Sequence, residues 1–208
     1  VAVNTAAVAD PELIRRGAET FGSQCVVVSI EAIREAPGAW KAYTDNGREP
    51  TGLDVLEWAA QAEALGAGEI LVTSVDTEGA GKGFDLDLIE QVCAAVSVPV
   101  IACGGAGTTA HAAELIERCA PGAVSAASMF HYGALGDMQV EKREEGNVNY
   151  LKEYFNGRTS FLEQFETVTP GELKRRLGLC ALQPECRGGS AEHPPCPVRS
   201  SAGGSATG

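Results

Sequence analysis

Short apolar runs alternate with amphipathic stretches along the first 130 or so residues of the chain. Five runs of strand length begin near residues 1, 25, 69, 98 and 123. Between them, apolar residues recur at helical spacing, for example over Leu86 to Val96 and over Thr109 to Cys119. This alternation is typical of parallel βαβ units, so we predict an α/β fold with five parallel strands.

The second apolar run, Cys25 to Ile30, is followed by an irregular stretch and not directly by a helix. Asn46-Gly47 is a strong hairpin-turn signal, and with the flanking Trp40 to Thr44 it predicts a small β-hairpin. A helix is expected to follow over Leu53 to Leu65. Its inward face is predicted to comprise Leu53, Leu56, Ala60 and Ala64.

The pattern changes beyond Tyr132. Asn149 to Tyr154 and Thr169 to Leu177 are predicted to be helical, the latter starting with a capping box and a proline. Cys180 to Gly208 has no periodicity and is rich in Gly, Ser, Pro and Ala, so we expect disorder there. We therefore divide the chain into a barrel-type domain over 1–179 and a tail over 180–208, which is either natural or a cloning remnant.

Composition excludes some classes of partner. The formal net charge of −12 over 208 residues argues against a nucleic-acid partner. No apolar run approaches the ~20 residues that cross a bilayer, so we expect no membrane contact. An odd cysteine count of seven without a visible secretory leader favours a reducing, cytoplasmic compartment. No His or Cys spacing fits a metal site, and we expect neither metal nor cofactor.

In a parallel barrel, functional residues lie at the carboxyl ends of the strands. Four such ends are polar or glycine-rich, namely Asn4-Thr5, Thr73 to Gly79, Cys103 to Gly107 and Ala126 to Ser128. Glycines after a strand let backbone amides approach a phosphate, and a following helix adds a favourable dipole. Two such loops from consecutive strands predict a phosphate site, although glycines of this kind also serve simply to form tight turns.

Glu31 is the titratable residue with the most interesting position, because it directly follows the buried run Val26 to Ile30. A partly buried carboxylate there is suited to general acid/base catalysis. The alternative is that Glu31 opens an exposed loop. His131 follows Met129-Phe130 at the end of the fifth strand, and we interpret it as a packing or hydrogen-bonding residue of the turn.

These motifs together resemble one family. From Val1 to about Gly133, the sequence closely resembles the cyclase subunit of imidazole glycerol phosphate synthase. The sister isomerase of histidine biosynthesis is similar but lacks the Gly-Gly-Ala-Gly and Met-Phe-His motifs. The segments that carry the resemblance are Val3-Asn4-Thr5-Ala6-Ala7, Phe21-Gly22-Ser23-Gln24, Gly66-Ala67-Gly68-Glu69, Thr73-Ser74-Val75-Asp76, Gly83-Phe84-Asp85-Leu86, Cys103-Gly104-Gly105-Ala106-Gly107 and Ala127-Ser128-Met129-Phe130-His131.

The resemblance implies an incomplete TIM (βα)8 barrel that comprises about the last five strands. It implies a lyase that takes a ribonucleotide with a phosphate at each end. Ammonia would come from a glutaminase (glutamine amidotransferase) partner docked at the opposite face. The products would be imidazole glycerol phosphate and an aminoimidazole carboxamide ribotide. The family's first catalytic aspartate would precede Val1, so we expect the chain alone to be inactive.

The resemblance also implies residue roles. Glu31 stands where the family has its second catalytic aspartate, and the extra methylene moves the carboxylate by about 1.5 Å, enough to cost ~10²-fold in rate. Glu78 replaces another aspartate, and Cys103 replaces a common serine. Asn4 and Thr5 would match one phosphate site, Glu78, Gly79, Gly104, Gly105, Ala127 and Ser128 the other, and Gln24 and Thr73 the substrate groove.

Two alternatives remain open. The segment from Asp137 to Leu177 looks more like cyclase paralogues of surface-polysaccharide clusters, which are implicated in amidating a sugar. The chain could also be a non-catalytic phosphate-binding remnant. Five strands of a barrel leave two open edges, so we expect the isolated chain to associate.

Overall fold

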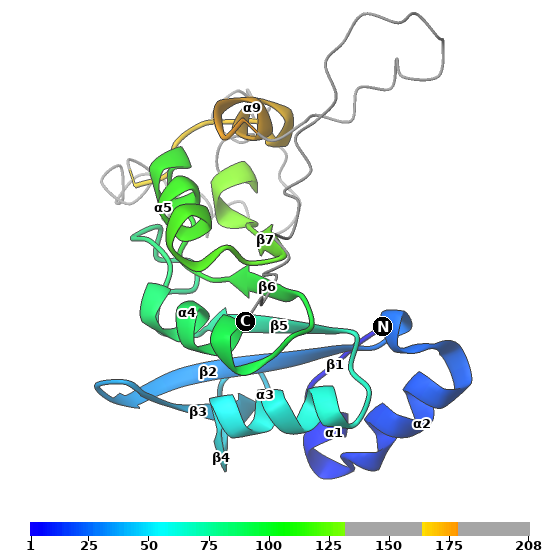
Figure 1. The fold of residues 1–208 in the computed structure, drawn as a ribbon. Helices are drawn as coiled ribbons and strands as arrows, with labels where there is room; N and C mark the ends of the chain where they lie inside the picture. The colour runs from blue at the N-terminus through cyan, green and yellow to red at the C-terminus, as the bar shows by residue number, and fades with distance from the viewer. Residues whose placement is uncertain (132–163, 179–208) are drawn as a thin grey trace, which may run out of the picture.

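The computed structural model describes residues 1–131 and 164–178. Its sheet contains the five predicted parallel strands, paired in chain order from one edge to the other (Figure 1). The α/β prediction and the parallel strand count are therefore confirmed. The parallel strands are β1 (Ala2–Val3), β2 (Val27–Ala36), β5 (Glu69–Ser74), β6 (Val100–Cys103) and β7 (Ala123–Ser125).

The predicted hairpin is also present. β3 (Ala39–Thr44) and β4 (Glu49–Asp54) continue the sheet beyond β2 as an antiparallel extension. The turn between them places Asp45, Asn46 and Gly47 at φ values of 51°, 57° and 76°. Asp, Asn and Gly are the residues that adopt this left-handed region at least cost, which explains why the chain reverses here.

β2 is longer than the apolar run predicted. Its parallel pairing with β5 ends at Ala32 and Ser74, but its pairing with β3 continues to Ala36. Glu31 therefore lies within a strand and does not open a loop.

The helices connect the parallel strands and pack on the sheet. Four begin with a side-chain cap: Asp54 before α3, Asp85 before α4, Thr108 before α5 and Thr169 before α9. The helices are α1 (Thr5–Ala9), α2 (Glu12–Phe21), the 3₁₀ turn η1 (Ser23–Cys25), α3 (Val55–Ala64), α4 (Leu86–Ala95), α5 (Thr109–Cys119) and α9 (Pro170–Arg176).

The predicted inward face of α3 was right for Leu53 and Leu56, which are partly buried and pack against the core, and wrong for Ala60 and Ala64. Its buried residues are Val55, Trp58, Ala59 and Ala62, whereas Ala60 and Ala64 are exposed. The reason is that Leu53 belongs to β4, so the helix starts after it and its face is set by Trp58.

Burial alternates along the parallel strands, as the two-residue period of a strand requires. Val28, Ile30 and Ala32 of β2 are at most 1% exposed, and their registered neighbours Ile70 and Val72 are fully buried. They share one hydrophobic core with helix residues Ile14, Trp58, Leu88 and Leu115. The other face of β2, with Val27, Ser29 and Glu31, is only half-buried.

Near the carboxyl terminus, α9 confirms the helix predicted over Thr169 to Leu177. The Thr169 hydroxyl accepts from the Glu172 amide at 3.2 Å, as the capping pattern requires. The predicted helix over 149–154, most of the 137–177 segment, the 179/180 boundary and the tail lie outside the described residues. No helix in 1–131 or 164–178 is long and apolar enough to cross a membrane.

Candidate functional site

A row of four side chains crosses the sheet at its carboxyl end. Glu31 is in register with Thr73, Thr73 with Cys103, and Cys103 with Ser125. Residues in register on parallel strands point to the same face. The four therefore lie on one face, with Thr73 buried and the other three half-buried, one layer above a row formed by Ser29, Leu71, Ile101 and Ala123.

A small pocket of about 50 Å³ continues this row at its β6–β7 end. Cys103 and Ser125 belong to both the row and the pocket lining. A pocket of this volume accommodates a small polar group and not a whole nucleotide. All six residues predicted for the second phosphate site line it: Glu78, Gly79, Gly104, Gly105, Ala127 and Ser128.

The glycines of the pocket are required by close packing as well as by backbone conformation. Gly104 and Gly105 have φ values of 93° and 103°. A Cβ on Gly104 would lie 2.6 Å from the Ser74 carbonyl oxygen, and one on Gly105 would lie 1.9 Å from the Gly83 carbonyl oxygen. The tight turn alone is therefore enough to explain these two glycines. Their position in the pocket lining is a separate observation.

Backbone donors surround the pocket. Among the described turns and loops, the amides of Gly105, Ala127 and Ser128 donate no hydrogen bond to another backbone group. Backbone amides that line a small pocket are a usual means of binding a phosphate without side-chain charge. His131 lies one turn further on, is exposed, and donates its amide to the Ala127 carbonyl at 2.9 Å.

Asn4 and Thr5 lie at the other side of the row. Asn4 follows β1, which pairs with β2 through Val3 and Val28. Its side-chain amide donates to the Tyr43 carbonyl at 3.2 Å, and Tyr43 is the antiparallel neighbour of Glu31. Glu31 is thus placed between the Asn4 side and the pocket side of the same sheet edge.

The carboxylate of Glu31 is held by the hairpin. Its Oε2 accepts a hydrogen bond of 2.8 Å from the Gly47 amide. Glu31 is half-buried, and within the described residues no hydrogen bond or ion pair engages its Oε1. One oxygen therefore fixes the side chain, and the other is free to exchange a proton with a bound molecule.

Gln24 is not brought to this site. It lies in η1, ahead of β2, whereas Glu31 lies in β2 seven positions later. At about 3.3 Å per residue, this places Gln24 roughly 20 Å away, at the amino ends of the strands. The residue precedes a strand, and only residues that follow a strand reach the carboxyl edge.

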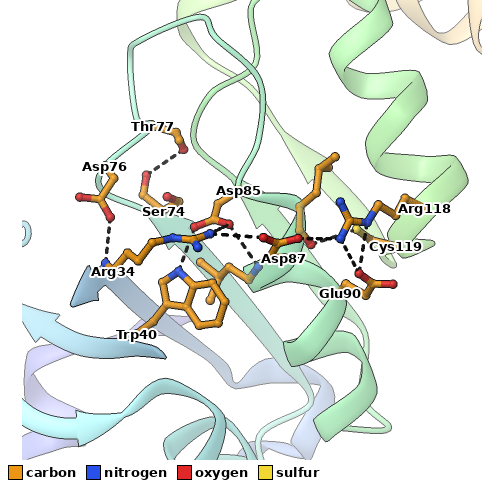
Figure 2. Close-up of polar contacts among 12 residues, drawn as sticks. Arg34, Trp40, Ser74, Asp76, Thr77, Asp85, Asp87, Glu90, Arg118 and Cys119 are labelled. Carbon is orange, nitrogen blue, oxygen red and sulfur yellow. Dashed lines mark hydrogen bonds and ion pairs between the residues drawn. The ribbon is translucent and has the colours of Figure 1, made fainter. Parts of the chain in front are cut away.

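An ionic network on the outer side of the strand ends was not foreseen from the sequence. Asp85 accepts from the Arg34 guanidinium at 2.6 Å and from the Trp40 indole at 2.9 Å, and Arg34 stacks over Trp40 at 4.7 Å (Figure 2). The Arg34 amide donates to Asp76 at 2.9 Å. The network ties the hairpin to α4 and to the loop that carries Glu78 and Gly79. Only the capping role of Asp85 ahead of Leu86 could have been read from the sequence.

The same network continues along α4. Arg118 of α5 bonds Asp87 and Glu90, and these hydrogen bonds raise the pKa of its guanidinium (Figure 2). Among residues 1–131 and 164–178, no group of three or more His, Cys, Asp or Glu is arranged to hold a metal ion.

Comparison with known proteins agrees with this architecture. The family model described as "Histidine biosynthesis protein" matches residues 1–136. The protein named imidazole glycerol phosphate synthase subunit HisF from Dehalococcoides mccartyi strain BAV1 is 51% identical over 142 residues, which is 68% of this chain and 56% of that protein. Its namesake from Streptococcus sanguinis is 49% identical over the same length. The chain spans about half the length of these relatives.

A parallel α/β sheet with a glycine-lined pocket at adjacent strand ends is typical of the class of (βα)8 barrels, here with five of the strands. The family match covers well over half of the chain. The chain belongs to the histidine biosynthesis protein family, and within it to the HisF family of imidazole glycerol phosphate synthase cyclase subunits.

Proposed function

We propose that this chain carries the cyclase site of an imidazole glycerol phosphate synthase, a lyase of histidine biosynthesis. The observation that carries the proposal is the position of Glu31, in one registered row between Asn4 and the glycine-lined pocket at the ends of β6 and β7. We call this pocket the anion pocket. Its substrate is a ribonucleotide with two phosphates, which ammonia converts to imidazole glycerol phosphate and an aminoimidazole carboxamide ribotide.

The geometry suits a long ligand with an anion at each end. β1 and β6 are separated by β2 and β5, which puts Asn4 and Gly105 on the order of 15 Å apart along the sheet edge. The amides of Gly105, Ala127 and Ser128 bind one phosphate, and Asn4 and Thr5 bind the other. Thr73, beside Glu31, contacts the middle of the ligand.

Glu31 acts as general acid/base in this proposal. Proton transfer to or from the ring that forms requires a carboxylate within hydrogen-bond reach of the reacting atoms. Glu31 points to the same face as Thr73 and keeps one oxygen available. The reaction uses ammonia supplied by a glutaminase subunit, and the relatives' name as a synthase "subunit" supports such a partner.

A second candidate is amidation of a sugar by a related ammonia-dependent cyclase. The observation that favours it is that the family model ends at residue 136, so the rest of the chain departs from the family pattern. Glu31 in place of an aspartate points in the same direction. In this case the pocket binds a phosphate of a different substrate.

Reconstitution tests the proposal. Because the matched 142 residues cover only 56% of the Dehalococcoides mccartyi relative, the chain is co-expressed with the N-terminal part of that relative, and consumption of the ribonucleotide is followed with ammonium salt. Turnover that requires both pieces is expected. A soluble, folded complex without turnover overturns the cyclase assignment and leaves sugar amidation or a non-catalytic phosphate-binding remnant.

A further inference from the structure

We propose that Glu166 is a positioning residue for the anion pocket, because it clamps the β6–α5 loop, which forms one of the two pocket walls. The inference rests on the proposed phosphate-binding role of this pocket and adds a part of the chain that no motif assigned to it. One wall comes from the loop after β5, with Gly79, and the other from the loop after β6, with Gly105.

Glu166 holds the β6–α5 loop by both its backbone and its side chain. Its amide donates to the Gly107 carbonyl at 2.7 Å. Its carboxylate accepts from the Thr109 amide at 2.6 Å, at the first residue of α5. One residue therefore fixes the loop between the pocket glycines and the helix that follows them.

The backbone is closely packed at Gly107. A Cβ on Gly107 would lie 2.2 Å from the Gly81 carbonyl oxygen and 2.7 Å from the Gln164 carbonyl oxygen. The Gly83 amide donates to the Gly105 carbonyl at 2.9 Å. The segment that carries Glu166 therefore lies close to the backbones of the loops after β5 and β6.

A neighbouring side chain completes the stack. Phe165 is 8% exposed, and its ring edge lies 3.0 Å from where a Cβ on Gly81 would stand. Phe165 also packs with Met129, which follows the pocket residue Ser128 directly. The segment therefore contacts all three strand-end loops that line the pocket.

Charge reinforces the clamp. The Thr109 amide is the main cause that lowers the pKa of the Glu166 carboxyl, so the group is ionised near neutral pH. An anion at the start of a helix is favourable because it faces unpaired amides and the positive end of the helix dipole. Since Glu166 already satisfies the α5 terminus, a bound phosphate is directed to the amides of Gly105, Ala127 and Ser128.

Glu172 of α9 provides a matched control for Glu166. Arg176 pairs with both carboxylates, but Glu172 lies in α9 itself, and among the described residues it makes no hydrogen bond or ion pair with the pocket loops. Loss of either carboxylate removes one partner of Arg176. Only loss of the Glu166 carboxylate releases the Thr109 amide, while the backbone bond to Gly107 stays in both variants.

Equilibrium dialysis of the full chain with radiolabelled inorganic phosphate tests the inference. Glu166→Ala is expected to raise the phosphate Kd about tenfold, because a charge-assisted hydrogen bond is lost. Glu166→Gln keeps an acceptor oxygen and should recover most of the affinity, and Glu172→Ala should stay within about twofold of the parent. Parent binding with an unchanged Glu166→Ala affinity overturns the clamp alone, whereas no binding by the parent overturns the clamp and the phosphate pocket together.

A second measurement needs no variant. Coupling between two sites is reciprocal. If the contacts of Glu166 strengthen phosphate binding, bound phosphate must also stabilise those contacts. Saturating inorganic phosphate is expected to slow hydrogen exchange of a peptide covering 164–168 in the parent chain, while a peptide covering the 36–39 turn stays unchanged. Equal exchange of the 164–168 peptide with and without phosphate overturns the inference even if Glu166→Ala fails to fold.

Discussion

The backbone amide of Gly47 donates a hydrogen bond of 2.8 Å to the carboxylate of Glu31, sixteen residues earlier in the chain. The β3–β4 turn therefore lies over the strand end that carries the proposed acid/base. Gly47 also packs closely on Val75, since a Cβ at Gly47 would lie 3.0 Å from that side chain. Turn and carboxylate form one unit, in which the turn sets the direction of the Glu31 side chain.

Substitution of the turn glycine should disturb this unit. Gly47→Ala introduces a side chain at φ 76° and against Val75, which displaces the amide that holds Glu31. We expect kcat/KM of the reconstituted enzyme to fall about 10- to 100-fold, as misplacement of a catalytic group does. Gly38→Ala is the control, because Gly38 has φ 73° but an open surrounding. Equal losses for the two variants would contradict the positioning role of Gly47.

Removal of the ionisable group at position 31 tests the acid/base assignment. Glu31→Gln preserves size and the acceptor for the Gly47 amide, but it cannot exchange a proton in the same way. We expect loss of turnover in the reconstituted enzyme, with substrate affinity within a few-fold of the parent. Steady-state kinetics and a binding titration measure the two quantities. A fully active Gln variant would remove Glu31 from the mechanism.

Asp85 should matter for stability far more than its neighbour Asp87. The Asp85 side chain is 7% exposed and accepts from Trp40, Arg34 and the Leu88 amide. Asp85→Ala leaves these donors unpaired and removes the α4 cap, which should lower the free energy of unfolding by about 2–4 kcal/mol.

Asp87→Ala is the matched control for this prediction. Asp87 is 54% exposed and bonds Arg118, so its loss should cost about 1 kcal/mol or less. Urea denaturation of both variants measures the difference. Similar unfolding midpoints for the two would show that the buried network contributes little.

Cysteine reactivity should follow burial. Cys119 is 7% exposed, and burial raises the pKa of its thiol to about 11, so almost no thiolate forms at pH 8. Cys25 is exposed. We expect iodoacetamide to modify Cys25 and leave Cys119 unmodified in the folded chain, as peptide mass spectrometry can measure. Rapid labelling of Cys119 without unfolding would indicate that α4 and α5 separate readily.

The open edges of the sheet should promote self-association of the 208-residue polypeptide. Among the described strands, β1 pairs only with β2, and β7 pairs only with β6. Val1 and Phe21, near the β1 edge, are 88% and 70% exposed. Unpaired strand edges beside exposed apolar side chains favour association. Size-exclusion chromatography should show oligomers or aggregates, and a stable compact monomer would refute the expectation.

Local patterns were sufficient for much of the fold. The strands, the hairpin turn at Asn46-Gly47 and the start of α9 each follow from residues within a few positions of one another. α1 was missed because Thr5–Ala9 is only five residues long and Asn4 provides no side-chain cap. A helix this short is stabilised by packing and not by its own propensity.

The candidate site, too, could be predicted from the sequence only in part. The pocket could be predicted because strand ends of consecutive parallel strands must adjoin, whatever the details of the loops. The contacts of Arg34 with Asp85 and of Glu166 with Thr109 span 51 and 57 residues, so they depend on tertiary packing that no local pattern encodes. Gln24 shows the converse error, since a matching motif does not say which end of a strand a residue occupies.

The parallel register of β2 with β5 ends at Ala32, and the hairpin pairing continues on its own to the turn at Pro37 and Gly38. Insertions or deletions at that turn would lengthen or shorten the hairpin without shifting any parallel strand. During divergence of the family, this segment could therefore change freely while Glu31 and the anion pocket keep their places. New substrate preferences could arise there by drift in loop length, at little cost to the inherited scaffold.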